Sequence, residues 1–351
     1  MKTEFIIIGQ GISGTWLSYY LQKEKKSFLV IDNNQQNASS RIAAGIINPV
    51  TGRRIVKTWM INELLNHLIP AYEELGKELQ INTITQKNLI DFHPTPQMKL
   101  AFQDRINEDD QFLKKPGDEK IFSNYFHSDF GFGEVNPCYM INLQEILSAW
   151  RKKLIENNQL LEETFDHSNL IYAVEKIRYK NIEADKIIFC DGSNSFSHPL
   201  FKNLPFSLNK GEVLILESNE IPSTHIFKKG MTLAPLGEHS FWVGSNYLWN
   251  FTDEHPTKEF RDQTELFLKK WIKVPFTIID HKAAIRPANI ERRPFVGFHP
   301  QNNNIGILNG MGTKGCSLAP YFAKQLVAHF IHNKEINPEV DLKRFSIILA
   351  R

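Results

Sequence analysis

Apolar residues form a short uninterrupted run near the start of the chain, and the pattern then changes twice. Residues 5–8 are continuously apolar, as expected of a strand buried on both faces. Residues 15–23 have the pattern of a helix, and residues 26–31 that of a second strand. This order predicts a β-α-β unit and places the chain in the α/β class.

The rest of the chain alternates between helical and strand-like patterns. Helices are predicted at 58–80, where Pro70 should bend or divide the helix, and at 96–115, 142–157, 257–273 and 318–332. Strands are predicted at 171–178, 186–190, 212–217, 225–228, 231–235, 240–245 and 305–308.

The two kinds of pattern are segregated along the chain. The α/β segments are residues 1–80, 141–205 and 280–351, and β-rich material occupies residues 81–140 and 206–279. We therefore expect a discontinuous Rossmann-like domain from the first set. An α+β, β-rich substrate domain from the second set would interrupt it.

A glycine motif joins the first strand to the first helix. Gly9 permits a tight turn, Gly11 lets the backbone approach a pyrophosphate, and Gly14 allows close packing of helix on strand. Ile12 and Ser13 begin the helix, whose N-terminal amides and dipole favour an anion. The motif alone is weak, but its position between strand and helix predicts a dinucleotide site.

Three further features indicate that this dinucleotide is FAD. Asp32 follows the second strand, where a carboxylate can accept hydrogen bonds from ribose hydroxyls. An apolar strand runs into Asp191 and Gly192, as in folds that bury the adenosine half of FAD. A glycine-rich turn before the last helix can direct amides at the flavin; its candidate contacts are Gly310, Gly312, Thr313, Lys314 and Gly315.

The whole chain resembles the D-amino-acid oxidase, glycine oxidase and sarcosine oxidase family. The matching segments are 39–49, 184–195, 209–216, 233–245, 283–297 and 309–320. The resemblance implies a glutathione-reductase-type FAD domain, with Ser40, Arg41, Ala44 and Gly45 beside the cofactor. It also implies noncovalent FAD, because no cysteine lies near Arg286, where sarcosine oxidases carry their flavin-linking residue.

The same resemblance gives candidates for substrate binding or flavin tuning. Arg286 matches the family arginine that pairs with a substrate carboxylate, for which a guanidinium fork is well suited. Thr313 and Thr232 stand where glycine oxidases carry a second arginine and a tyrosine, and these departures leave the substrate open. Lys210 and Arg53 are further candidates, each with an ordinary structural alternative.

These motifs predict an FAD-dependent oxidoreductase that oxidises a C–N bond of an amine or amino acid. A single GxGxxG gives no second nucleotide domain, so electrons would pass to oxygen or another acceptor. Two alternatives stay open. Residues 43–54 also resemble the flavin domain of an enzyme that modifies a tRNA base amine, and the chain could bind FAD without catalysis.

Composition narrows these possibilities only slightly. Hydrophobic residues make up 42% of the chain and charged residues 23%, with a net charge of +2 that gives no nucleic-acid footprint. The three cysteines are widely spaced, and the histidines show no metal-ligand spacing, so we expect no disulfide framework and no metal. We expect no membrane span and a cytoplasmic protein. The oligomeric state is left open.

Overall fold

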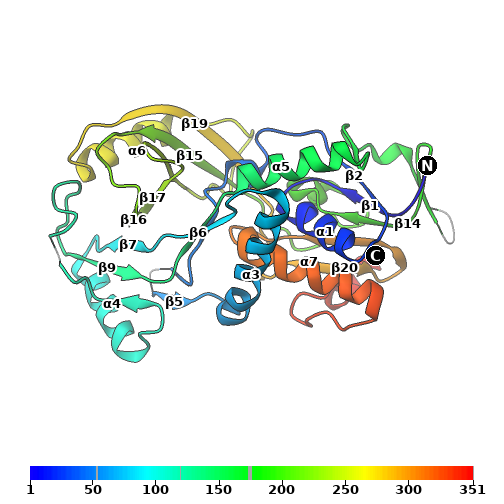
Figure 1. Cartoon of the computed structure of the whole chain (residues 1–351), viewed down its shortest axis with the longest axis horizontal. Coiled ribbons are helices and arrows are strands. Elements are labelled where there is room, and N and C mark those ends of the chain that lie inside the picture. Colours follow the sequence, from blue (N-terminus) through cyan, green and yellow to red (C-terminus); the bar gives the residue numbers. More distant parts are fainter. Residues whose placement is uncertain (53, 119, 173–175, 351) are drawn as a thin grey trace.

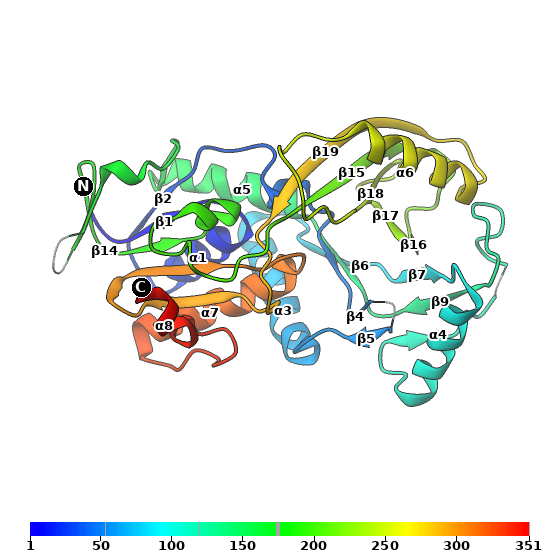
Figure 2. The same ribbon diagram turned by 180° about the vertical axis from the view of Figure 1, so that it is seen from behind.

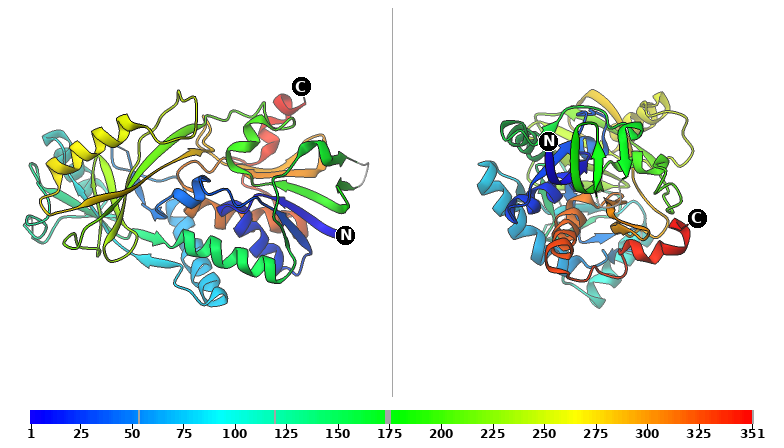
Figure 3. Two further views of the ribbon diagram at one scale, coloured as in Figure 1. Left: turned by 90° about the horizontal axis from the view of Figure 1, so that it is seen from above. Right: turned by 90° about the vertical axis from the view of Figure 1, so that its right-hand side faces the viewer.

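The computed structural model describes residues 1–52, 54–118, 120–172 and 176–350. It has two lobes side by side along its long axis, and both chain termini lie in the same lobe (Figure 1). The view from above shows the same elongated arrangement, with long strands connecting the lobes (Figure 3).

The lobe that carries the termini is built on a largely parallel sheet. Its parallel strands, in spatial order, are β11 (Leu160–Leu161), β2 (Phe28–Ile31), β1 (Lys2–Ile8), β14 (Ile182–Phe189) and β21 (Asn302–Asn309). Antiparallel neighbours extend this sheet: β13 (Ile177–Tyr179), β12 (Leu170–Tyr172) and β20 (Phe295–His299).

Side chains of β1 alternate between two hydrophobic clusters, so the sheet is buried on both faces. Phe5 and Ile7 pack on one side, against a cluster drawn largely from α1 (Ile12–Lys23), α3 (Ile61–Leu79), α5 (Leu143–Glu156) and α7 (Gly315–His332). Ile6 and Ile8 pack on the other. That second face is covered by the loop residues Phe201, Leu204 and Phe206, by η3 (Leu342–Phe345) and by α8 (Ser346–Leu349). Two further short elements, η1 (His167–Asn169) and η2 (Gly192–Ser197), follow β11 and β14 in the chain.

The second lobe is built on a mixed sheet of eight strands. Its order is β19 (Thr277–Arg286), β15 (Asn209–Glu217), β18 (Ser240–Gly244), β17 (Met231–Pro235), β16 (Ile226–Lys229), β7 (Leu89–Phe92), β9 (Phe132–Val135) and β8 (Leu113–Lys114). Leu214 and Leu216 pack outward against α6 (Lys258–Trp271). Val213 packs inward against α2 (Ser39–Ile42), which belongs to the first lobe.

Smaller elements complete the fold, most of them around the junction of the lobes. They are β3 (Ile46–Ile47), β10 (Tyr139–Ile141) and β6 (Ile84–Gln86), the hairpin β4 (Val50–Thr51) and β5 (Val56–Lys57), and α4 (Pro96–Glu108) at the far end. Figure 2, from behind, shows β15 and β19 running from the second lobe to this junction.

Two of the predicted elements differ from the structure, and other elements were not predicted. The helix predicted at 96–115 is α4, which ends at Glu108, and residues 113–114 form the strand β8. The single strand expected at 171–178 is the antiparallel pair β12 and β13, and residues 173–175 lie outside the described chain. The ten-residue strand β19 was not predicted, and it crosses the expected domain boundary at residue 280. β19 is an edge strand whose middle carries Asp280, His281 and Lys282, so its sequence lacks the apolar pattern of a buried strand. The domain boundaries stay a prediction.

Candidate active site

A cavity of ≈ 560 Å³ lies at the junction and is lined by residues of both lobes. Most of the predicted site residues line it: Gly9, Gly11, Ile12, Ser13, Asp32, Ser40, Arg41, Ala44, Gly45, Asp191, Gly192, Arg286, Gly312, Thr313 and Gly315. The structure places Gly14, Gly310, Lys314 and Lys210 outside the lining of this cavity. Arg53 lies outside the described residues.

The glycine motif forms the tight turn between β1 and α1. Gly9 has a φ of +95°, and a Cβ atom there would lie 2.7 Å from the carbonyl oxygen of Cys190. Gly14 faces this turn instead of the cavity, since a Cβ atom there would lie 1.9 Å from the carbonyl oxygen of Gly9. Neither position accepts a side chain without moving the backbone.

The N-terminus of α1 opens onto the cavity, and no acidic side chain of its first turn compensates the positive end of the helix dipole. Its N-cap residue, Gly11, provides no side-chain cap, and the first turn holds no acidic residue. The amide of Ile12 donates to Ser40 Oγ at 3.1 Å, which ties the turn to α2. A helix start with free amides and an uncompensated positive dipole end fits a pyrophosphate.

Asp32 lies at the end of β2 within a network of charges. Its carboxylate accepts from the amides of Gln10 and Asn34, each at 2.8 Å, and from Arg151 Nη1 at 2.6 Å. Arg151 is 6% exposed and also contacts Glu162 at 2.8 Å. These contacts hold the carboxylate at the cavity wall, where one oxygen can still accept from a ribose hydroxyl.

The sequence analysis did not identify Arg151, although a signal for it was present. Leu147, Trp150 and Leu154 mark the buried side of α5, and position 151 lies four residues after Leu147 on that side. A charged residue on an otherwise apolar helix face needs a buried partner. Asp32 is that partner.

The second predicted motif, which ends in Asp191 and Gly192, places the partly buried carboxylic acid of Asp191 on the cavity wall. Burial raises the pKa of Asp191 to about 6, although its hydrogen bond from Ser195 Oγ opposes this effect. Asn309, at the end of β21, donates to Gly192 O at 2.8 Å and to Ser195 Oγ at 2.9 Å. Asn309 thus joins the second motif to the third, a role not evident from the sequence.

The third motif ends at the start of α7. Gly312 N donates to Pro287 O at 3.2 Å, so the turn lies beside the end of β19. Helix α7 has Lys314 as its N-cap, no side-chain cap and no acidic residue in its first turn. The turn therefore presents a second uncompensated helix start to the cavity.

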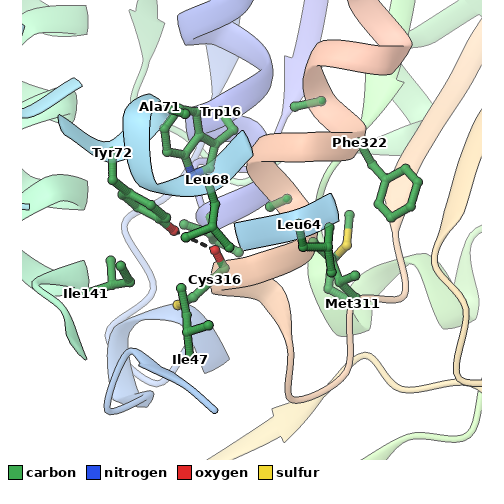
Figure 4. Close-up of a cluster of buried hydrophobic side chains, with 14 of the residues drawn as sticks. Trp16, Ile47, Leu64, Leu68, Ala71, Tyr72, Ile141, Met311, Cys316 and Phe322 are labelled. Carbon is green, nitrogen blue, oxygen red and sulfur yellow. Dashed lines mark hydrogen bonds between the residues drawn. The ribbon is translucent and has the colours of Figure 1, made fainter. Parts of the chain in front are cut away.

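A hydrophobic cluster fixes the first turn of α7 in place (Figure 4). Leu64, Leu68 and Ala71 of α3 pack with Trp16 and Phe322. From α3, the hydroxyl of the fully buried Tyr72 donates to the carbonyl of Cys316 at 2.9 Å. The position of the glycine-rich turn relative to α1 thus depends on buried packing behind it.

Arg286 lies at the opposite end of the cavity from Asp32, at the end of β19. Its guanidinium donates to Asn209 Oδ1 at 2.6 Å, to Ser245 Oγ at 2.6 Å and to Asn246 O at 3.1 Å. All three acceptors are neutral, and burial lowers the pKa of Arg286. Among the described residues no carboxylate forms an ion pair with it.

Two neighbours shape the position of this guanidinium. A Cβ atom at Gly211 would lie 1.7 Å from Arg286 Nη2, so only glycine leaves room for the side chain. The ring of Tyr247 lies over the guanidinium at 4.7 Å. Tyr247 and Trp242, which donates to Ile42 O at 2.8 Å, also line the cavity, and neither was identified from the sequence.

Lys210 lies on the other side of β15 from Gly211. Its Nζ donates to His255 O at 2.8 Å and lies 3.7 Å from Asp253 Oδ1. It lines a separate, more open cavity next to α6. In the described chain it therefore does not face the cavity that holds Arg286, because neighbouring residues of a strand point to opposite faces.

The two-lobed fold, with a Rossmann-like sheet and an elongated cavity closed by a second sheet, defines a dinucleotide-dependent enzyme of the flavoprotein type. The chain belongs to the DAO family of FAD dependent oxidoreductases, whose family model matches residues 4–329. The predicted family, fold class and FAD cofactor are thereby confirmed, and so is the prediction of an enzyme.

Known proteins similar to this chain match it over nearly its whole length. Glycine oxidase of Bacillus subtilis (strain 168) is 23% identical over 360 residues, which cover 96% of this chain and 95% of the relative. The structure of glycine oxidase from Geobacillus kaustophilus has a TM-score of 0.79 at 18% identity, covering 98% of both chains. Iminodiacetate oxidase from Chelativorans sp. BNC1 has a TM-score of 0.78 at 16% identity, also covering 98% of both chains. At these identities the structural likeness shows the fold.

Two further findings concern metal binding and membrane spans in the part of the chain that the structure describes. They contain no group of His, Cys, Asp or Glu side chains arranged to hold a metal ion. No helix among them is both long and apolar enough to cross a membrane.

Proposed function

We propose that this oxidoreductase oxidises the C–N bond of an amine that carries a carboxylate, and that Arg286 binds this carboxylate. The observation that carries the proposal is the half-buried guanidinium on the cavity wall, whose recorded acceptors are all neutral. A buried cation without a counter-charge is costly. An incoming carboxylate would offset this cost and accept two parallel N–H donors.

The chain's own residues would orient the substrate. FAD supplies the chemistry, since it accepts a hydride equivalent from the carbon next to the nitrogen. Asn209 and Ser245 hold the guanidinium fork in one orientation, and Gly211 lets it lie against the backbone of β15. The uncapped first turn of α7 would stabilise negative charge that develops beside it.

Proton transfer is left largely to the substrate. Of the described residues on β15, β18 and β19 that line the cavity, Arg286 alone carries a titratable side chain, and it cannot act as a base. Tyr247, which lies over the Arg286 guanidinium, is a further titratable side chain on the cavity wall. We infer that the amine binds in its neutral form or loses its proton to water. The rate of substrate-driven flavin reduction should accordingly rise with pH through the pKa of the substrate amine.

The relatives support a small amine substrate without identifying it. By name they oxidise glycine and iminodiacetate, and each of these carries both an amine and a carboxylate. Thr313 lines the cavity, but it is exposed and can offer a hydroxyl only. Thr232 is outside the cavity lining. We therefore propose one principal carboxylate anchor, with oxygen or another acceptor taking the electrons.

An anaerobic screen with matched amine pairs tests the proposal. Glycine and methylamine, or sarcosine and dimethylamine, differ by a carboxylate on the carbon that is bonded to the reacting nitrogen. We expect bleaching of the oxidised flavin band by carboxylate-bearing amines and not by their partners. Equal bleaching by both members of every pair would contradict a carboxylate requirement.

Two cations near the segment that suggested the tRNA alternative are paired within the chain. Lys57 pairs with Asp109, and Arg293 Nε pairs with Glu339 at 3.0 Å while its guanidinium lies over Trp59. Binding of tRNA would need cations such as these to neutralise phosphates, which would make the affinity fall steeply with salt. The proposed partner is a small molecule.

A further inference from the structure

Lys314 occupies an unusual position at the boundary between the cavity and the protein interior. It is the N-cap of α7, and its neighbours Gly312, Thr313 and Gly315 line the cavity. Its Nζ lies 3.0 Å from Oγ1 of the buried Thr58, whose hydroxyl donates to Asn48 O at 3.2 Å. The ammonium is thus held at a fixed place behind the turn.

The charge of Lys314 has no acidic partner among the described residues. Burial lowers its pKa to about 8, with no carboxylate opposing that effect. Two other enclosed cations have such a partner, since Lys228 lies 2.7 Å from Asp91 and Arg151 lies 2.6 Å from Asp32. Arg286 shares the lack of one among the described residues. Lys314 also lies at the positive end of the α7 dipole, where a cation is unfavourable.

The turn that carries this charge follows the cavity wall. At one end Gly312 contacts Pro287, next to Arg286. At the other, a Cβ atom on Gly315 would lie 3.0 Å from Ile12 Cγ2, in the first turn of α1. The segment between them joins the pyrophosphate turn to the substrate anchor, so it would flank the redox-active end of a bound FAD.

We propose that Lys314 is an electrostatic tuning residue that favours reduction of FAD through its charge, without contacting the substrate. Uptake of two electrons and one proton leaves the reduced flavin ring with one negative charge. That charge would offset the cost of the uncompensated ammonium and of the helix dipole together. Reduction therefore becomes easier while Lys314 is protonated.

The midpoint potential of the bound FAD tests this directly, by anaerobic equilibration of the holoenzyme with a reference dye. In Lys314→Met we expect the equilibrium constant for two-electron reduction to fall at least tenfold, which corresponds to about 30 mV. Lys314→Arg keeps the charge and should restore most of the wild-type potential. Lys314→Gln provides a second neutral variant.

Thr58→Val is the matched control, which tests whether Lys314 acts only by supporting the structure of the turn and not through its charge. It removes the hydroxyl that holds Lys314 Nζ but keeps the charge, so the potential should stay close to that of the wild type. An unchanged potential in both neutral variants would overturn the proposal, as would an equal shift in Thr58→Val. Loss of FAD from both neutral variants would also overturn it, because Lys314 would then hold the cofactor. No substrate is needed, so the result is independent of the Arg286 proposal.

Discussion

At the scale of single residues, the cavity is organised by charges that are paired at one end and unpaired at the other. Asp32 is paired with Arg151 at the end expected to hold adenosine, and no carboxylate of the described residues pairs with Arg286 at the expected substrate end. A paired charge keeps its geometry in the absence of ligand, whereas an unpaired one favours binding of an anion. The two ends therefore respond differently to substitution.

Asp32→Ala should weaken FAD binding about ten- to a hundredfold, since a charged hydrogen-bond partner contributes about 1.5–3 kcal/mol. Arg151→Met should weaken it as well, because Asp32 would lose the contact that orients it. Glu162→Gln is the control, since Glu162 contacts the same arginine from a largely exposed position. Quenching of FAD fluorescence gives the dissociation constants. If Arg151→Met binds FAD with the wild-type dissociation constant, Asp32 does not depend on Arg151 for its orientation.

Asp191 should make the stability of the apoprotein depend on pH. Its pKa is raised from 3.8 to about 6, so the folded state binds a proton at pH values where the unfolded state has lost it. Stability attributable to this residue is therefore lost as pH rises from about 4 to about 6. Asp191→Asn should stabilise the apoprotein at pH 7 by at most about 3 kcal/mol, and much less at pH 4. Urea unfolding at both pH values measures this, and an equal gain at both would contradict the assignment.

The residues that could be predicted from the sequence are those within local motifs. Asp32 and Gly9 have fixed positions relative to a strand and a helix, and Arg286 matched a family block. Arg151 and Asn309 act through partners more than 100 positions away, as the separations of 119 and 117 residues show. The apolar helix face around Arg151 indicates that this residue is buried, but no local pattern identifies its partner, and Asn309 has no such signal.

At the scale of elements, the first turn of α7 is positioned from behind by α3. Tyr72→Phe removes the hydroxyl that donates to Cys316 O but keeps the ring packed on Trp16. We expect a loss of about 1 kcal/mol in the free energy of unfolding, measured by urea denaturation. Tyr139→Phe is the control, since no hydrogen bond of its hydroxyl is recorded among the described residues. Equal denaturation midpoints for the two variants would contradict the role of Tyr72.

Elements with a strong local pattern were predicted well, and elements stabilised by distant partners were not. The strand β17 was predicted with its observed bounds, Met231–Pro235, because its turn and apolar residues are adjacent in sequence. Strand β19 depends on pairing with β15 more than sixty positions earlier, and its polar middle is tolerated only because it lies at an edge. Its end nevertheless carries Arg286.

At the scale of the whole molecule, residues of both lobes line the cavity in which FAD is expected to bind. We predict that FAD is bound noncovalently and is released by acid denaturation. Cys190 and Cys316 line the cavity, but burial raises the pKa of both thiols, that of Cys316 to about 12, and a neutral thiol is a poor nucleophile. Yellow colour remaining with the washed protein pellet would contradict this prediction.

The central claim is that Arg286 binds the carboxylate of an amine substrate, and stopped-flow flavin reduction under anaerobic conditions tests it most directly. With the best amine from the screen, Arg286→Ala should lose most substrate-driven reduction. Arg286→Lys should lose less, because it keeps the charge but not the planar fork. FAD content should be unchanged in both variants. If both are reduced at the wild-type rate with the wild-type concentration dependence, Arg286 does not bind the substrate and the account is contradicted.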